Sequence, residues 1–289
     1  MHCRYSVIGV FFFVLVGVWA FFAWSSFFPK PTSSNVLLVT AIPPNPCKTD
    51  YGDHYNLLSI KNKQDYANIH GYIVFVGSEQ IDPSLDGAWN KAALMKRLME
   101  TTNYEWYVWV DIDALVVNQE FALPLNKYHG RDFILWGQEA QIFDKGDPHS
   151  GLNSGVFLLR KSEWSKQFID EVCSLGKKDN QEVLQNGLQS TFNMALFDQN
   201  AFVFVLKKLG RLRSIPHIVL ERSYYLNGNW RELGPEVLSK KNPFIVHFAG
   251  CRFCEGGQIP EEDKTLCKAN FLPTFDFAHK LALSRLKLG

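Results

Sequence analysis

The stretch WYVWVDIDALVVN, residues 106–118, decides how the rest of the chain is interpreted. Trp106 to Val110 is a continuous apolar run of the kind that forms a strand buried on both faces of a sheet. Asp111 and Asp113 follow this run directly, and residues i and i+2 of an extended segment point to the same side. The sequence therefore predicts two carboxylates presented together at the carboxyl end of a buried strand.

Apolar runs of the same kind recur along the chain and alternate with segments of helical spacing. We predict further strands at residues 36–41, 72–76, 133–136, 155–159 and 243–248, and helices at residues 55–69 and 90–100. This alternation is typical of an α/β fold with a mostly parallel central sheet that helices cover on both faces. Such sheets bind ligands beyond the carboxyl ends of their strands, which is where the aspartate pair lies.

The aspartate pair predicts a metal site. Asp111 and Asp113 repel each other when both are ionised, unless a cation lies between them. Carboxylate oxygens suit Mg²⁺ or Mn²⁺, and such an ion can also bind phosphate oxygens. The alternative is a solvated turn, but apolar residues on both sides favour burial and hence a bound partner. As a third ligand, His247 would shift the preference toward Mn²⁺; its alternative is a satisfied core histidine.

Composition excludes several classes of protein. With 289 residues and 46% hydrophobic residues, the chain can bury a sizeable core, so it is not a disordered protein. The 30 Lys and Arg residues balance 29 Asp and Glu residues, so no basic field would hold a nucleic acid. The GxGxxG, GxxxxGK[ST] and GxSxG patterns are absent, which leaves dinucleotide, P-loop and serine-hydrolase readings without support.

The N-terminal region predicts a membrane anchor. Residues 7–28 carry no charged side chain and are long enough to cross a bilayer as a helix. Their length and their bulky aromatic residues favour an uncleaved signal anchor over a cleaved signal peptide. Arg4 precedes the run, so the positive-inside rule predicts a cytoplasmic tail at residues 1–6. A short stem at residues 29–35 and a luminal domain at residues 36–289 would follow.

Cysteine usage agrees with a luminal domain. Five cysteines follow the predicted anchor, at positions 47, 173, 251, 254 and 267, and an oxidising lumen allows them to pair. One is left over if every pair is internal. A zinc knuckle around Cys251 and Cys254 is the alternative, but neither a second CxxC nor an HxxxH pattern accompanies it.

Seven segments, among them WVDIDALVVN, GLNSGVFLLR and HFAGCRFC, resemble segments of one known protein family and occur in the same order along the chain. They are residues 43–72, 89–99, 109–118, 151–160, 197–206, 224–230 and 247–254. In these segments the chain resembles the galactosyl-, mannosyl- and xylosyltransferase family. That family includes plant xyloglucan 6-xylosyltransferases, galactomannan galactosyltransferases and yeast Golgi α-1,6-mannosyltransferase subunits. The resemblance implies a GT-A, Rossmann-like fold and a retaining, Mn²⁺-dependent transfer from a nucleotide sugar, with Mg²⁺ as the alternative ion.

The resemblance also implies roles for individual residues around the metal. Asp111, Asp113 and His247 would hold the ion. Gly250 and Arg252 would contact the diphosphate of the donor, although plant members usually have Lys at the position of Arg252. The charge is kept, but a guanidinium presents a planar fork of donors where a lysine presents a single point charge.

Further residues are assigned to the donor. Thr40, Lys63 and Tyr66 lie in segments that would line the nucleotide. Asp198 and Gln199 would lie on the β face of the donor sugar, beside the acceptor. The alternative for Asp198 is a helix N-cap, because it precedes an apolar helical segment.

Acceptor binding rests on weaker signals. Trp89, Asn153 and Trp230 are candidates, because sugar rings stack on aromatic side chains and bond to polar ones. Core packing is the alternative for each tryptophan. The polar residues 227–229 favour a loop, which would leave Trp230 exposed.

We therefore expect an α-glycosyltransferase that transfers a sugar, xylose favoured, from a UDP-sugar to a polysaccharide or glycan acceptor. UDP-galactose and GDP-mannose are the alternative donors. A non-catalytic Golgi partner that binds polysaccharide is the alternative outside enzymology, because Phe197 stands where plant members have an acidic residue. The protein is expected to be a single-pass type II protein of the Golgi membrane. Homo- or hetero-oligomers with related transferases are its expected protein partners.

Overall fold

The computed structural model describes residues 35–85, 87–145, 151–187, 197–210, 215–255 and 260–287. The predicted tail and anchor, together with all of the predicted stem before Asn35, lie outside the described residues. Within the described ranges, no helix is both long enough and apolar enough to span a bilayer.

Six strands form the central sheet, in the order β2-β1-β3-β6-β5-β7. Their bounds are β1 Val36–Ala41, β2 Ile73–Gly77, β3 Trp106–Val110, β5 Phe133–Gly137, β6 Leu152–Arg160 and β7 Ile218–Leu220. Five strands run in one direction, and β6 runs against both of its neighbours. The sheet is therefore mixed: three of its strand pairs are parallel, as predicted, and the two pairs that involve β6 are antiparallel. β6 follows β5 along the chain and pairs with it in the antiparallel sense, which needs no crossover connection.

Three short strands form a second sheet in the order β4-β9-β8. They are β4 Ala114–Val116, β8 Gly228–Asn229 and β9 Ile245–His247. The strand predicted at residues 243–248 therefore belongs to this sheet and not to the central one. Because β4 begins directly after Asp113, the turn that carries the two aspartates connects the two sheets.

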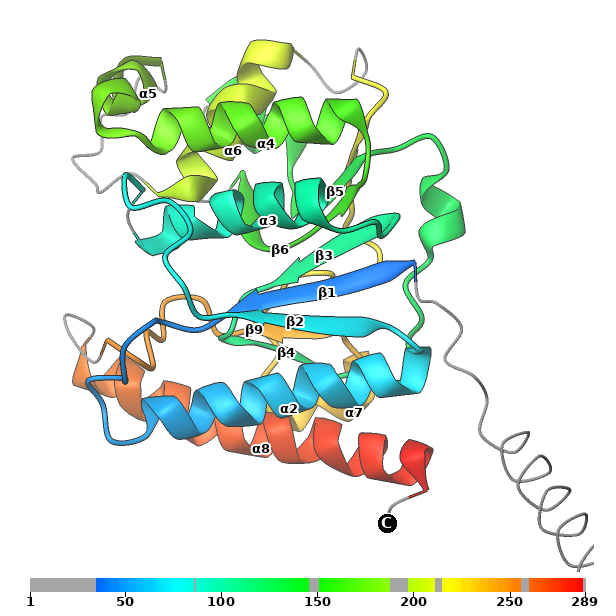
Figure 1. Ribbon diagram of the computed structural model, residues 1–289. Coiled ribbons are helices and arrows are strands. Elements are labelled where there is room, and N and C mark those ends of the chain that lie inside the picture. Colours follow the sequence, from blue (N-terminus) through cyan, green and yellow to red (C-terminus); the bar gives the residue numbers. More distant parts are fainter. Residues whose placement is uncertain are drawn as a thin grey trace, which may run out of the picture. The chain divides into compact units, whose positions relative to one another are not determined.

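Helices lie on both sides of the central sheet (Figure 1). The α-helices are α2 Gly52–His70, α3 Asn90–Thr101, α4 Glu163–Gly176, α5 Gln181–Gly187, α6 Asp198–Leu209, α7 Pro235–Lys241 and α8 Glu261–Leu286. Shorter turns are η1 Gly87–Trp89, η2 Leu125–Tyr128, η3 Gln141–Lys145 and η4 Lys178–Asn180. One apolar core joins the central sheet to α3, α4 and α6, and two others join the sheets to α2 and α8.

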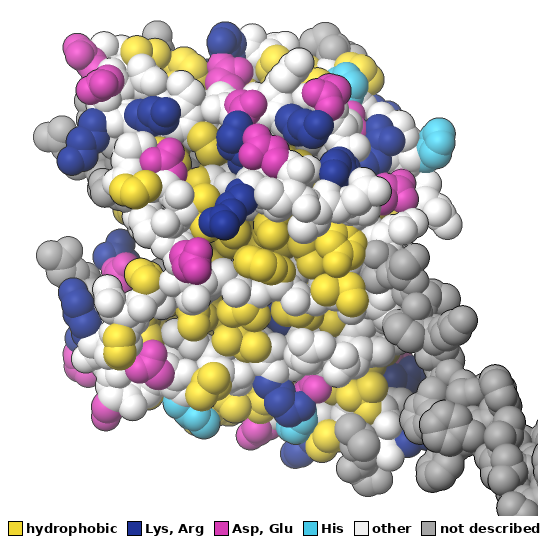
Figure 2. Space-filling model, viewed as in Figure 1, with side chains coloured by type: hydrophobic (Ala, Val, Ile, Leu, Met, Phe, Trp, Pro, Cys, Tyr) yellow, Lys and Arg dark blue, Asp and Glu magenta, His cyan; other side chains and the backbone are white. Residues whose placement is uncertain are grey.

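The edge strand β2 is only partly covered. Ile73 and Phe75 keep 44% and 37% of their surface exposed, although they lie in a strand. In the space-filling view, apolar side chains gather along this edge between the α3 and α2 layers (Figure 2). The predicted strand thus exists, but it is not buried on both faces: Ile73 and Phe75 lie two residues apart on one face, which is incompletely covered.

Two disulfide bonds hold the loop that follows β9, one across 207 residues of sequence and one across 16. Cys47 is bonded to Cys254 and Cys251 to Cys267, while Cys173 is a buried free thiol. The prediction of disulfides rather than a zinc knuckle is therefore confirmed. The first bond joins the loop that follows β9, which carries Gly250 and Arg252, to the segment before α2, and the second joins the same loop to α8.

Candidate functional site

The two aspartates and the distant histidine meet at one place. His247 Nε2 lies 3.2 Å from Asp113 Oδ1 and 3.8 Å from Asp111 Oδ2. One ligand atom from each residue lies within 4.8 Å of the other two. Two carboxylate oxygens and one imidazole nitrogen form a donor set that fits a divalent cation such as Mn²⁺. The structure thus brings together the three residues that the sequence assigns to the ion.

Backbone pairing explains this meeting. In the second sheet, Ala114 of β4 pairs with His247 of β9, so the histidine lies beside the aspartate turn. On the other side, the Asp111 N–H donates to the Gly155 carbonyl at 2.8 Å, which ties the turn to β6. Gly155 also leaves room for the imidazole: a Cβ there would lie 2.1 Å from His247 Cε1. Only glycine allows the ring to lie this close to β6.

A lysine that the sequence interpretation missed, Lys91, connects the three candidate metal ligands to Asp198. We call the group made up of Lys91, Asp111, Asp113, Asp198 and His247 the polar cluster. Lys91 is 8% exposed, and its Nζ lies 3.1 Å from an oxygen of Asp111 and 3.1 Å from one of Asp198. It also donates to the Ser154 carbonyl at 3.1 Å. The signal was present: Leu94 and other apolar residues follow Lys91 at helical spacing, which places the lysine on the buried stripe of α3.

Asp198 and Gln199, the predicted sugar-binding pair, contact β6. Asp198 is 4% exposed and accepts a hydrogen bond from Ser154 Oγ at 2.8 Å. Gln199 Oε1 accepts one from the Ser154 backbone N–H at 3.2 Å. The capping alternative for Asp198 is wrong, because the cap residue is Phe197, whose N–H donates to Asn200 Oδ1 at 2.9 Å. The buried carboxylate of Asp198 therefore serves the polar cluster and not the helix end.

Burial and the neighbouring charges shift the pKa values of Asp111, Asp113 and His247. Burial raises the pKa of Asp111, although Lys91 and His247 oppose this effect. Burial would also raise the pKa of Asp113, but the charge and hydrogen bond of His247 outweigh it and lower that pKa. Burial would lower the pKa of His247, but Asp113 and Asp111 raise it. A proton is thus attracted to the space between the three side chains, and a divalent cation would satisfy the same electrostatic demand.

The three residues assigned to the nucleotide differ in their surroundings. Thr40, near the carboxyl end of β1, is fully buried, and its Oγ1 has no hydrogen-bond partner among the described residues. Lys63 is buried on α2 and donates to the Ala114 carbonyl at 2.8 Å, so it supports the aspartate turn from behind. Tyr66 is buried too, and its hydroxyl donates to the Phe121 carbonyl at 2.8 Å. Only Thr40 keeps a side-chain oxygen unbonded.

The two residues assigned to the diphosphate lie on the disulfide-bonded loop. Gly250 has a φ of 85°, and a Cβ built on it would meet nothing within 4 Å among the described residues. Arg252 is exposed, with its guanidinium 3.8 Å from the Glu255 carboxylate. The Cys254 carbonyl accepts from the Lys48 N–H at 2.9 Å, which anchors the loop. A rigid loop therefore presents a solvent-accessible guanidinium.

Two of the three acceptor candidates are buried aromatic residues. Trp89 is 2% exposed within the core beside α3, as its packing alternative predicts. The expected exposure of Trp230 is wrong: it is 4% exposed and stacks on Phe248. The reason is that Gly228 and Asn229 pair as β8 with β9, which makes the segment part of a sheet and directs the tryptophan inward.

Asn153, the third acceptor candidate, points into the polar cluster. Its Oδ1 accepts hydrogen bonds from the Gly155 N–H at 2.8 Å and from Asn227 Nδ2 at 2.5 Å. Asn227 in turn contacts His247 Nδ1 through Oδ1 at 2.8 Å. The sequence interpretation treated Asn227 only as a loop residue, and no pattern in its neighbours indicates the contact.

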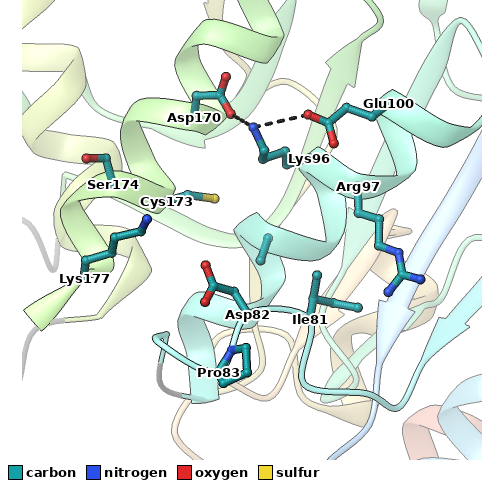
Figure 3. Close-up of a pocket in the computed structure, with 11 residues that line it drawn as sticks. Ile81, Asp82, Pro83, Lys96, Arg97, Glu100, Asp170, Cys173, Ser174 and Lys177 are labelled. Atoms are coloured by element: carbon teal, nitrogen blue, oxygen red, sulfur yellow. Dashed lines mark hydrogen bonds and ion pairs between the residues drawn. The ribbon is translucent and has the colours of Figure 1, made fainter.

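A separate cavity of about 440 Å³ lies between α3, α4 and the loop after β2 (Figure 3). Lys96 of α3 forms ion pairs with Asp170 of α4 and with Glu100 on its own helix, and the sulfur of Cys173 points toward the cavity. Burial raises the pKa of that thiol to about 12. None of the described residues that line the cavity belongs to the polar cluster, so this cavity is distinct from the candidate site.

Comparison with known proteins supports the resemblance. The model of the galactosyl transferase GMA12/MNN10 family matches residues 32–258. Xyloglucan 6-xylosyltransferase 1 from Arabidopsis thaliana is 33% identical over 253 residues, which cover 81% of this chain and 55% of that protein. Probable glycosyltransferase 2 from Oryza sativa subsp. japonica is 33% identical over 268 residues, covering 86% of this chain and 54% of that protein. The chain thus spans about half the length of these curated relatives.

A solved structure shows the fold. The crystal structure of a glycosyltransferase involved in the glycosylation of the major capsid of PBCV-1 aligns with a TM-score of 0.53 at 15% sequence identity. The alignment covers 81% of this chain and 98% of that one. At this identity the likeness concerns architecture alone, and it shows a GT-A-like α/β fold with a mixed central sheet.

Proposed function

Because the chain belongs to the galactosyl transferase GMA12/MNN10 family, we propose that it is a retaining α-glycosyltransferase that uses a nucleotide sugar. The observation that carries this proposal is the convergence of Asp111, Asp113 and His247 from two sheets. Asp198 lies on the other side of the cluster, joined to Asp111 through Lys91. Three candidate ligands for a divalent cation and a buried carboxylate within one cluster suit the breaking of a sugar–diphosphate bond, in which the leaving group gains negative charge and the sugar positive charge.

The chemistry at the diphosphate follows from the donor set. Asp111, Asp113 and His247 would hold the divalent cation, Mn²⁺ before Mg²⁺ because one donor is an imidazole. When bound, the cation supplies Lewis-acid neutralisation of the diphosphate leaving group. The exposed guanidinium of Arg252 adds charge-assisted hydrogen bonds, which strengthen as negative charge develops on the leaving oxygens.

The chemistry at the sugar is assigned to the other half of the cluster. Lys91 and the Ser154 hydroxyl hold the Asp198 carboxylate in one orientation, at 3.1 Å and 2.8 Å. We assign to Asp198 the stabilisation of positive charge on the sugar as the bond to the leaving group lengthens. Gln199, fixed by the Ser154 N–H, is assigned to the sugar or acceptor hydroxyls beside it.

The donor, acceptor and compartment belong to the same proposal. UDP-xylose is the first donor to test, because relatives at 31–33% identity are named xyloglucan 6-xylosyltransferases. The acceptor would then be a glucan or another polysaccharide. The two disulfide bonds support a luminal domain, because such bonds persist in oxidising compartments. With the apolar run at residues 7–28, they support a type II protein of the Golgi membrane.

The test is transfer by the full chain. Purified protein with Mn²⁺ and glucan oligosaccharides is incubated with UDP-xylose, UDP-galactose and GDP-mannose, and glycosylated products are measured by mass spectrometry. We expect transfer from one donor, and loss of about a hundredfold or more in Asp113→Asn, because metal neutralisation supplies several kcal/mol. Asp170→Asn, an exposed aspartate on α4, is the matched control and should keep full activity.

Two outcomes would contradict the proposal. Undiminished transfer by Asp113→Asn would refute the metal assignment. Transfer from none of the three donors by the folded wild-type protein would instead favour a non-catalytic partner that binds polysaccharide.

A further inference from the structure

Asn227 lies between His247 and β6 and is 9% exposed. It lies two residues after Tyr225, which has a left-handed φ of 53°, and directly before β8, whose Gly228 pairs with Val246 of β9. A Cβ at Gly228 would lie 2.3 Å from a methyl carbon of Leu233, so the chain passes here only with glycine. The backbone therefore holds Asn227 at a fixed position beside the imidazole.

The hydrogen bonds determine the orientation of the two side-chain amides, that is, where the oxygen and the NH₂ group of Asn153 and Asn227 lie. The Gly155 backbone N–H can only donate, so the Asn153 atom 2.8 Å away is its oxygen. That same oxygen lies 2.5 Å from Asn227, which must therefore present its NH₂ group to it. The oxygen of Asn227 is then the atom that lies 2.8 Å from His247 Nδ1. An amide oxygen only accepts, so His247 Nδ1 carries a proton.

The consequence concerns the metal-facing atom. Nε2 is hydrogen-bonded to the Asp113 carboxylate at 3.2 Å. With Nδ1 protonated, loss of the Nε2 proton leaves a neutral imidazole whose lone pair is on Nε2. Nε2 is the atom that faces Asp113 and Asp111. Metal-binding histidines are generally oriented in this way by a hydrogen bond from the other ring nitrogen, and such partners control affinity.

We propose that Asn227 is a positioning residue that fixes the orientation and tautomer of His247 through a chain of amides anchored on the Gly155 backbone. This inference rests on the proposed function, because it matters only if His247 holds a divalent cation. Asn153, assigned to the acceptor by sequence, is the middle member of the chain: it acts through Asn227 and contributes only its oxygen.

The test is a calorimetric titration of the metal-free full chain with Mn²⁺. Asn227→Leu removes the acceptor from Nδ1 and should weaken Mn²⁺ binding about 10- to 100-fold, the usual effect of losing such a partner. Asn153→Asp keeps the oxygen that accepts both hydrogen bonds and should retain most of the affinity, whereas Asn153→Leu should not. Asn229→Leu, an exposed asparagine of β8, is the matched control and should bind as the wild type does.

A second measurement separates positioning from general damage to the fold. In transfer assays, Asn227→Leu should need more Mn²⁺ for half-maximal activity, while its kcat at saturating Mn²⁺ stays close to that of the wild type. Unchanged Mn²⁺ affinity in Asn227→Leu would overturn the inference, and so would equal losses in Asn153→Asp and Asn153→Leu. Absence of Mn²⁺ binding by the wild type would instead refute the metal assignment of the proposed function, and this inference with it.

Discussion

Replacing Lys91 by methionine is the perturbation whose size the structure specifies best. The ammonium lies 3.1 Å from both Asp111 and Asp198, and the side chain is 8% exposed. At an effective dielectric constant of about 20, each such contact is worth about 5 kcal/mol of Coulomb energy before desolvation is counted. Methionine has a similar length but no charge, so the substitution leaves the buried carboxylate of Asp198 and the partly buried carboxylate of Asp111 without their shared cation.

Desolvation reduces the net effect. Burying an ammonium costs several kcal/mol, which the two carboxylates offset in the wild type. Removing one partner of a buried ion pair typically costs about 3–5 kcal/mol, because the remaining charge stays buried without compensation. We therefore expect Lys91→Met to lower the free energy of unfolding by about 3–5 kcal/mol at pH 7. It should also abolish transfer, since Asp198 loses the group that orients it.

The assay is urea denaturation monitored by tryptophan fluorescence, with EDTA present to exclude bound metal. Lys96→Met is the matched control, because Lys96 lies on the same helix with 39% of its side chain exposed and pairs with Asp170 and Glu100. Exposed pairs contribute about 1 kcal/mol or less, so this variant should be nearly as stable as the wild type. Equal, small losses in the two variants would refute the view that Lys91 is a buried charge compensator.

Two further substitutions test other parts of the account. Burial lowers the pKa of Lys63 to about 7, while the unfolded chain keeps its proton to about pH 10.5, so stability should rise with pH between these values. The free energy of unfolding of the wild type and of the half-exposed control Lys61→Met should rise by about 2 kcal/mol from pH 7 to 9, whereas Lys63→Met should lack this gain. Equal dependence of the unfolding free energy on pH in all three proteins would exclude a buried neutral lysine. Gly155→Ala would place a Cβ 2.1 Å from His247 Cε1, so Mn²⁺ affinity should fall at least tenfold, as for loss of a ligand's support. Gly87→Ala, where a Cβ meets nothing within 4 Å in the described part of the chain, should leave Mn²⁺ titrations unchanged. Similar affinities in both variants would contradict the close approach of the ring.

The strands and the aspartate turn were predictable from sequence because their signal is local. The predicted strand at 106–110 agrees with β3, and Gly71 ends α2 with a left-handed φ of 68°. The direction of β6 was not predictable, because an apolar run has the same pattern whether its neighbours run parallel or antiparallel. Its orientation depends on which strand it pairs with, and that is a tertiary property.

In the candidate site, too, the residues that local sequence predicts differ from those whose position depends on tertiary structure. Asp111 and Asp113 are neighbours in sequence, so their common orientation follows from strand geometry alone. The place of His247 depended on a family resemblance. Lys91 was missed because lysine is usually a surface residue, and only the apolar stripe around it indicated burial. Trp230 was placed outside because its polar neighbours look like a loop, whereas strand pairing made them a sheet edge.

The central claim is that a divalent cation binds between one aspartate turn and one distant imidazole. Diffraction data recorded at the manganese absorption edge, from crystals of the protein soaked with Mn²⁺ and UDP, test this directly. We expect an anomalous peak within about 2–2.5 Å of a carboxylate oxygen of Asp111, one of Asp113, and the Nε2 atom of His247. A peak elsewhere, or coordination through Nδ1 of the histidine, would contradict it.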